Sequence, residues 1–205
     1  PWAGIAHDET FDPTPYADAV ARFLLRNPMN QNLPRKFKIA FSGCGDDAGL
    51  TAVQDLGARA AVQTIDGQAV RGFTILLGGG LGPAPQLAQP LEKFTPAGDL
   101  FPTVAAIVRV FDRHGNRENR NMARLKFVVQ TLGIDPLRAL ILRERDALRL
   151  TMAGQFPVVE PREAHPPAPG SRNRGALALS DPTSLRWYRT NVLRQKQLGY
   201  AAVHV

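Results

Sequence analysis

Cysteine is nearly absent from this sequence, since only Cys44 occurs among 205 residues. One thiol cannot form a disulfide bond within the chain, and it cannot supply the several thiolates that hold a structural zinc ion or an iron–sulfur cluster. Asp46 and Asp47, close to Cys44, are more typical of a polar turn than of a metal site. The histidines also lack ligand spacing, and we expect surface or structural roles for His7, His114, His165 and His204. The sequence therefore predicts no metal site built from this chain alone.

Long apolar runs are absent as well. No segment of the sequence approaches the length that crosses a bilayer, and the first residues do not read as a signal peptide. The apolar fraction of 44% is nevertheless ordinary for a globular protein with a core. We therefore expect a soluble, cytoplasmic protein with no membrane partner.

Acidic residues are outnumbered, with 18 Asp and Glu against 25 Lys and Arg, which gives a net charge of +7. Such an excess indicates an anionic partner: nucleic acid, phosphate, a carboxylate-rich cofactor or an acidic protein. Few aromatic residues accompany the basic clusters, which counts against the stacking of single-stranded bases. We therefore expect nucleic acid to be an improbable partner.

Hydrophobic periodicity predicts four helices and three strands. The helices are expected over residues 16–26, 99–114, 119–132 and 135–150, and the strands over residues 36–42, 60–65 and 71–77. Asp66-Gly67 is typical of a hairpin turn and would join the last two strands. The combination predicts the α+β (α/β) class, a mixed sheet with helices packed on it, over residues 1–150.

The rest of the chain has a different composition. Residues 151–184 are rich in proline and predict an irregular connection. Residues 185–205 read as the start of a new unit. The chain begins with Pro1 and not with Met, and residues 199–205 read as a strand with no following turn. From these features we expect a piece of a longer protein.

A basic run precedes the first predicted strand. In an extended chain successive side chains alternate between two faces, so Lys36 and Lys38 would project from one face and Arg35, Phe37 and Ile39 from the other. Two neighbouring ammonium groups suit a small, multiply charged anion. The alternative is that the lysines protect an exposed sheet edge against aggregation.

Two further motifs could contact a ligand. Arg117, Arg120 and Arg124 are three and four residues apart, so on a helix they would share one face, where they would either bind an anion or be solvated. Gly79 and Gly80 follow a predicted strand and allow close backbone approach to a ligand, although a tight turn is the commoner role of such a run. The glycine run matches neither a Walker loop nor a dinucleotide fingerprint.

Taken together, these motifs resemble the siroheme-containing nitrite/sulfite reductases. The resemblance rests on three runs in the order of that family: Leu33-Pro34-Arg35-Lys36-Phe37-Lys38, Gly72-Phe73 to Gly80-Leu81, and Gly115-Asn116-Arg117 through Ala123-Arg124-Leu125-Lys126. It implies that residues 1–150 have the fold of the family's siroheme-binding α/β domain, in the first of two pseudo-symmetric halves. It also implies that residues 185–205 begin the second ferredoxin-like half-domain and are truncated there.

The resemblance further implies a reaction. The family reduces nitrite to ammonia or sulfite to sulfide in a multi-electron reaction at siroheme coupled to a 4Fe–4S cluster, with ferredoxin or a flavoprotein as electron donor. Lys36 and Lys38 are implied to bind the substrate anion as catalytic residues. The cofactor-binding residues are implied to be Arg35 and Arg124, to which we add Arg117, Arg120, Gly79 and Gly80. The family's four cluster cysteines have no counterpart here, so we expect this chain alone to be inactive.

Two other interpretations stay open. The chain could be a basic module that binds nucleic acid or phosphate, in which case its binding would weaken steeply with salt. It could also be a precorrin-modifying relative of the same fold. The pair Lys36 and Lys38 favours the reductase over both.

Overall fold

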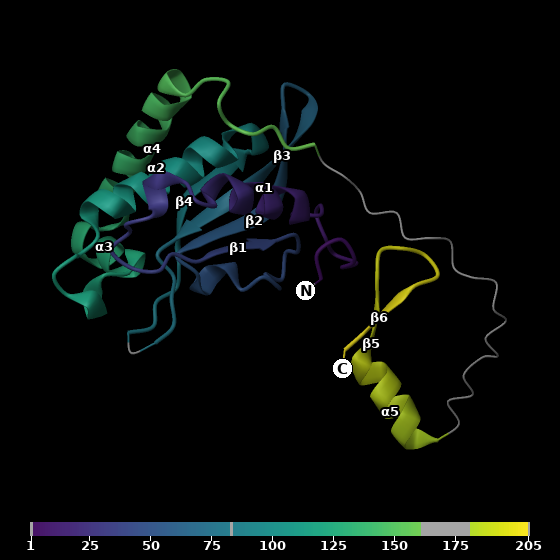
Figure 1. Ribbon diagram of the computed structural model, residues 1–205. Coiled ribbons are helices and arrows are strands. Elements are labelled where there is room, and N and C mark those ends of the chain that lie inside the picture. The colour runs from purple at the N-terminus through teal and green to yellow at the C-terminus, as the bar shows by residue number, and fades with distance from the viewer. Residues whose placement is uncertain (1, 83, 161–180, 205) are drawn as a thin grey trace.

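The computed structural model describes residues 2–82, 84–160 and 181–204. Figure 1 shows one sheet with helices gathered against it, followed by a small helical and hairpin segment at the C-terminal end. This arrangement confirms the predicted mixed sheet with helices packed on it. None of the described helices is both long and apolar enough to cross a membrane.

The main sheet has four strands in the order β1-β2-β3-β4, namely β1 (Ile39–Ser42), β2 (Leu56–Ile65), β3 (Gln68–Leu77) and β4 (Gln89–Pro96). The strands β1 and β2 are parallel, and the other neighbouring pairs are antiparallel. The predicted hairpin is confirmed, and both turn residues, Asp66 and Gly67, have positive φ angles, as a tight primed turn requires. The starts of three strands differ from the prediction: β1 starts three residues later, β2 four residues earlier and β3 three residues earlier. The strand β4 was not predicted.

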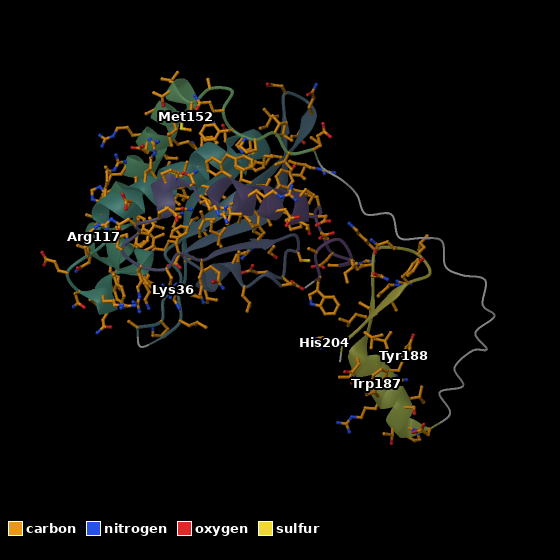
Figure 2. All side chains as sticks on the ribbon, viewed as in Figure 1. Lys36, Arg117, Met152, Trp187, Tyr188 and His204 are labelled. Carbon is orange, nitrogen blue, oxygen red and sulfur yellow. The ribbon has the colours of Figure 1, made fainter. Side chains whose placement is uncertain are left out.

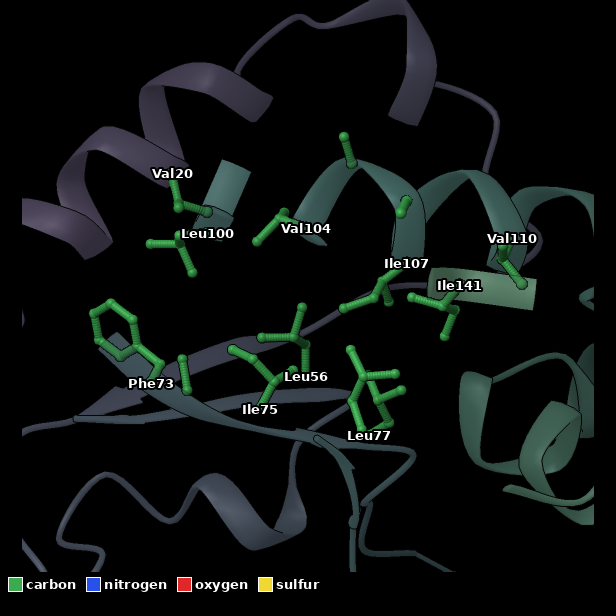
Figure 3. Packing of buried hydrophobic residues seen from close by; sticks show 14 of the residues in the cluster. Val20, Leu56, Phe73, Ile75, Leu77, Leu100, Val104, Ile107, Val110 and Ile141 are labelled. Atoms are coloured by element: carbon green, nitrogen blue, oxygen red, sulfur yellow. The ribbon is translucent and has the colours of Figure 1, made fainter. Parts of the chain in front are cut away.

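The helices α1 (Thr14–Leu24), α2 (Leu100–His114) and α4 (Ile134–Thr151) cover the sheet. They follow the predicted ranges within two residues. Figure 3 shows the apolar face of α2 packed on side chains from the sheet, with α1 and α4 closing the core around it. The residues that it labels are all buried: Val20, Leu56, Phe73, Ile75, Leu77, Leu100, Val104, Ile107, Val110 and Ile141. A rigid layer of this kind fixes the ends of the strands, where the basic motifs lie.

One predicted helix is wrong in its first turn. The range 119–132 contains a short 3₁₀ turn, η4 (Arg120–Met122), and the helix α3 (Leu125–Leu132) starts only after it. The Asn116 side chain accepts hydrogen bonds from the backbone N–H groups of Glu118 and Asn119, and the Asn119 side chain accepts one from Asn121. Such local bonds compete with helical ones, and they hold this stretch in turns.

The C-terminal segment comprises α5 (Pro182–Asn191), β5 (Val192–Arg194) and β6 (Ala201–Val203), with β5 and β6 paired antiparallel. Its hairpin loop contacts the N-terminal segment, because the backbone N–H of Lys196 donates to the Ile5 carbonyl at 3.0 Å and the Gln197 side chain donates to the Gly4 carbonyl at 2.6 Å. Most of the predicted connection over residues 151–184 lies outside the described residues. The part that is described beyond α4, up to residue 160, has no helix or strand.

Candidate functional site

Most of the predicted site residues, but not Arg117 and Arg120, lie at the edge of the sheet where strands begin or end. At this edge β1 and β2 begin and β3 ends, because Ile39 pairs with Leu56 and Leu56 pairs with Leu77. The segment before β1 carries the two lysines, and the segment after β3 carries the glycine run. Residues far apart in the sequence therefore meet at one end of the core.

Lys36 and Lys38 lie in the segment that leads into β1 and not in the strand itself. Their exposure still follows the predicted alternation, since both lysines are exposed while Phe37 between them is partly buried. The Phe37 ring packs on the buried Phe111 ring of α2 at 5.6 Å between centroids. Among the described residues, neither ammonium group has a salt-bridge partner. Both amines are therefore free to meet an anion from solvent.

Asp55, directly before β2, is the centre of the hydrogen bonds at this edge. Its side chain has no exposed surface. Its Oδ2 accepts the backbone N–H of Lys38 at 2.9 Å and Nη2 of Arg124 at 2.8 Å, and its Oδ1 accepts Nε of Arg124 at 3.2 Å. Asp55 is not among the predicted site residues, because a single acid before a strand carries no local pattern.

Arg124 precedes α3 as its N-cap residue, and only 14% of its side chain is exposed. The pair with Asp55 uses Nε and one N–H of Nη2, so the two N–H groups of Nη1 and the second of Nη2 stay available to an acceptor. A Cβ atom at Gly80 would lie 3.0 Å from Nη1, 3.1 Å from Nη2 and 3.2 Å from Cζ of Arg124. The absence of a side chain at Gly80 therefore lets the guanidinium lie close against the backbone.

Gly79 has a different role from Gly80. A Cβ atom there would lie 2.5 Å from the carbonyl oxygen of Ala52, and the Gly79 N–H donates to the Gln54 carbonyl at 2.9 Å. Protein backbone thus occupies the space beside Gly79. Its lack of a side chain serves the packing of the loop over residues 52–54.

The structure does not place the three arginines on one helical face, so that prediction is wrong. Arg117 lies on the loop after α2 and forms an exposed ion pair with Asp112, 2.6 Å from Nη2 to Oδ1. Arg120 is exposed at the start of η4. In Figure 2 Arg117 lies on this loop, whereas Lys36 lies on the segment that leads into β1. Only Arg124 of the three contacts the hydrogen-bonded edge around Asp55.

A cavity of about 580 Å³ lies between the end of α1 and the basic run. Its polar lining comes from Arg26, Asn30, Gln31, Arg35 and Lys36, and its apolar lining includes Phe37 and Val108. Cationic and apolar side chains that line one hollow suit a ligand with an apolar body and carboxylate substituents. Arg35, a predicted cofactor contact, thus lines the same cavity as Lys36.

Cys44 is the single thiol of this chain. It is buried, and the described residues contain no group of three or more His, Cys, Asp or Glu side chains placed to hold a metal ion. Burial first, and then the nearby acids Asp8, Glu9 and Asp46, raise the pKa of the Cys44 thiol to about 11. An iron–sulfur cluster requires several thiolates, so this chain's own residues do not fit one.

We expect Cys44 to react slowly with iodoacetamide in the native protein. The rise of its pKa from 9.0 to about 11 lowers the thiolate fraction near neutral pH by about 100-fold, and only the thiolate reacts. The measurement is the labelling rate at pH 8, with the urea-unfolded protein as the control that reacts at an ordinary rate. Rapid labelling of the folded protein would contradict the buried, acid-flanked position.

Asp47 confirms the polar-turn interpretation of the acids near Cys44. Oδ1 of Asp47 accepts hydrogen bonds from the backbone N–H of Thr51 at 3.0 Å and from the Thr51 hydroxyl at 2.6 Å. Oδ2 of Asp47 accepts one from the Ala52 N–H at 3.1 Å. Burial alone would raise the pKa of the Asp47 carboxyl. The hydrogen bonds from Thr51 and Ala52 and the charge of Arg59 outweigh burial, and together they lower this pKa below its usual 3.8.

Because the pKa of Asp47 is lower in the folded state, its contribution to stability is present above about pH 4 and is lost as the pH falls through the folded pKa. We expect Asp47→Asn to lower the free energy of unfolding at pH 7 by about 1–3 kcal/mol, as for hydrogen bonds to a charged group. The difference from wild type should shrink toward pH 2.5. Urea unfolding at both pH values measures it, with exposed Asp46→Asn as the matched control. A difference of equal size at both pH values would contradict the assignment.

The chain was compared with known proteins. The family described as "Nitrite and sulphite reductase 4Fe-4S domain" matches residues 1–149. An assimilatory ferredoxin-dependent nitrite reductase of Haloferax mediterranei is 31% identical over 157 residues, 76% of this chain and 27% of that protein. Sulfite reductase (ferredoxin) 1 of Mycolicibacterium paratuberculosis is 36% identical over 144 residues, 70% of this chain and 25% of that protein.

A solved structure is similar as well. The NirA protein of Mycobacterium tuberculosis matches with a TM-score of 0.63 and 30% identity, over 79% of this chain and 27% of that chain. The present chain thus spans about a quarter of the length of the curated relatives that it matches.

Proposed function

The chain belongs to the nitrite and sulphite reductase family, and on this premise we propose that it forms the siroheme-facing and anion-binding part of a siroheme-dependent reductase of nitrite or sulfite. The observation that carries the proposal is the edge of the sheet around Asp55. There the backbone N–H of Lys38 and the guanidinium of Arg124 donate to the same buried carboxylate. The side chains of Lys36 and Lys38 are exposed, and neither has an ion-pair partner among the described residues.

The residues at this edge fit a polycarboxylate macrocycle. Arg124 offers the N–H groups that Asp55 does not bind, and Gly80 adds no side chain beside the guanidinium. Arg35 lines the neighbouring cavity with Lys36. Guanidinium groups bind carboxylates through paired, charge-assisted hydrogen bonds, so Arg35 and Arg124 would hold siroheme by its carboxylates. Siroheme, when bound, supplies the iron and the conjugated ring through which electrons reach the anion.

The other predicted cofactor contacts have weaker support. Arg117 is engaged with Asp112, and Arg120 is exposed on a 3₁₀ turn. Gly79 packs against protein backbone. We keep Arg117 and Arg120 as proposed contacts to the carboxylates at the periphery of the ring, and we propose that Gly79 acts by shaping the glycine run.

Lys36 and Lys38 would act on the substrate anion. Two ammonium groups attract nitrite or sulfite and stabilise its negative charge. Each Nζ can also donate a proton to an oxygen of the anion as that oxygen departs, which is general acid catalysis. The part that we propose for these two side chains is thus anion binding and proton supply.

Further components of the reaction lie beyond this chain's own residues. The cluster thiolates have to come from elsewhere, since Cys44 is a single buried thiol. The relatives from Haloferax and Mycolicibacterium carry ferredoxin in their names, and we propose ferredoxin as the electron donor here too, with a flavoprotein as the alternative. We also propose that the reductase works in the cytoplasm and that this chain alone does not turn over substrate.

The visible spectrum of the whole reductase tests the proposal. When the reductase that contains this chain is purified from cells that make siroheme, we expect siroheme absorption, which should be absent from cells without siroheme synthesis. A colourless protein from both cell types would contradict the proposal. If that colourless protein also retarded duplex DNA in a strongly salt-dependent way, the nucleic-acid interpretation would replace it.

A further inference from the structure

Asp55 joins three segments that are far apart in the sequence. The Lys38 backbone lies 17 residues before it, and Arg124 lies 69 residues after it. The Lys38 N–H and the Nε and Nη2 groups of Arg124 all donate to the Asp55 carboxylate, which has no exposed surface. The carboxylate is therefore the common support of the lysine segment and of the arginine before α3.

The backbone of Lys38 is held on both sides at this point. Its N–H donates to Oδ2 of Asp55 at 2.9 Å, and its carbonyl accepts the N–H of Leu56 at 3.0 Å. The Lys38 side chain is nevertheless exposed. A fixed backbone with a free side chain sets where the ammonium group can reach.

Arg124 is oriented by the same carboxylate. Asp55 binds the side of the guanidinium that carries Nε and Nη2, so Nη1 is the nitrogen that this carboxylate does not bind. Without the carboxylate the flexible side chain has no described group that selects this orientation. The open edge of Arg124 thus depends on Asp55.

We propose that Asp55 is a positioning residue that fixes Lys38 and Arg124 relative to each other, so that the anion and the macrocycle are held in one geometry. This inference rests on the proposed function. Asp55 reaches neither ligand itself, because its oxygens are occupied by protein donors and its side chain is buried. Supporting groups of this kind typically change affinity or activity by about 10–100-fold when they are replaced.

The test replaces Asp55 by Asn in the siroheme-loaded reductase and measures kcat/KM for nitrite and sulfite per bound siroheme. An Asn side chain keeps the shape but presents an N–H₂ group where at least one of the three donors needs an acceptor. We expect kcat/KM to fall by about 10–100-fold. The matched control is Glu9→Gln, which alters another carboxylate without exposed surface. Glu9 lies outside this edge and forms an ion pair with Lys196, 2.8 Å from Oε2 to Nζ. Glu9→Gln should leave kcat/KM per siroheme within about twofold of wild type, as expected of a site that shares no partner with this edge.

A second readout does not depend on activity. In the protein without siroheme, hydrogen exchange of the Lys38 amide should become at least about tenfold faster in Asp55→Asn, while amides at the centre of β3 keep their protection. Should Asp55→Asn give too little folded protein, Asp55→Glu is measured in its place, since it keeps the charge but moves the carboxylate by one methylene. The same losses are expected for that variant.

The outcomes separate this inference from the proposed function. Unchanged kcat/KM per siroheme together with unchanged Lys38 exchange would overturn the positioning role of Asp55. A loss of kcat/KM that Glu9→Gln shares equally would also overturn it, since the effect would then be one of general stability. If the reductase holds no siroheme, the proposed function fails, and the Lys38 exchange still decides whether Asp55 fixes this segment.

Discussion

Replacing Lys36 or Lys38 by alanine is expected to lower kcat/KM for nitrite or sulfite by about 10²–10⁴-fold in the siroheme-loaded reductase, the range that one proton-donating group contributes. Both side chains are exposed and lack an ion-pair partner among the described residues. Little folding stability therefore depends on them. The loss should appear in kinetics measured per bound siroheme, with the free energy of unfolding unchanged within about 0.5 kcal/mol.

The control for this prediction is Lys93→Ala, which removes another exposed lysine, on β4. It should leave kcat/KM unchanged. Lys36→Arg and Lys38→Arg separate charge from proton supply, because arginine keeps the charge but does not release its proton near neutral pH. Wild-type activity in both alanine variants would remove the substrate role of the lysines.

Replacing Arg124 by alanine is expected to lower the free energy of unfolding by about 3–5 kcal/mol, the cost of leaving a buried charge without its partner. Asp55 has no exposed surface and would lose two of its three donors. Urea unfolding of the protein without cofactor measures this change. The amount of siroheme in the loaded reductase should fall as well, because the same guanidinium faces the proposed ring.

Arg117→Ala is the matched control for Arg124. Its ion pair with Asp112 is exposed, with 45% and 40% of the two side chains accessible, so we expect a cost of about 0–1 kcal/mol. If Arg124→Ala and Arg117→Ala lowered the free energy of unfolding equally, the stabilising role proposed for the buried pair of Arg124 and Asp55 would be wrong.

The sequence predicted the parts of the fold that depend on local chemistry. Asp66-Gly67 marked the hairpin because few residue pairs tolerate two positive φ angles. The helix α2 was recognised from the periodicity of its apolar residues. In contrast, β4 depends on pairing with β3, and it contains Pro90 and ends at Pro96, which weaken the local strand signal.

The candidate site was predicted only in part, for the same reason. The predicted alternation of exposed and partly buried side chains at Lys36, Phe37 and Lys38 is observed although β1 starts later. Such alternation requires only an extended backbone and not a hydrogen-bonded strand. The prediction that the arginines share one helical face is wrong, because the side chains of Asn116 and Asn119 accept hydrogen bonds from nearby backbone N–H groups and interrupt the helix. Asp55 could not be recognised, since its donors are distant in sequence and meet it only in the folded protein.

A crystal structure of the siroheme-loaded reductase with nitrite or sulfite bound tests the account most directly. We predict that Lys36 and Lys38 each place Nζ at hydrogen-bond distance, about 3 Å, from the bound anion, with Arg124 on a ring carboxylate. An anion bound elsewhere, with Lys36 and Lys38 turned to solvent, would contradict the account.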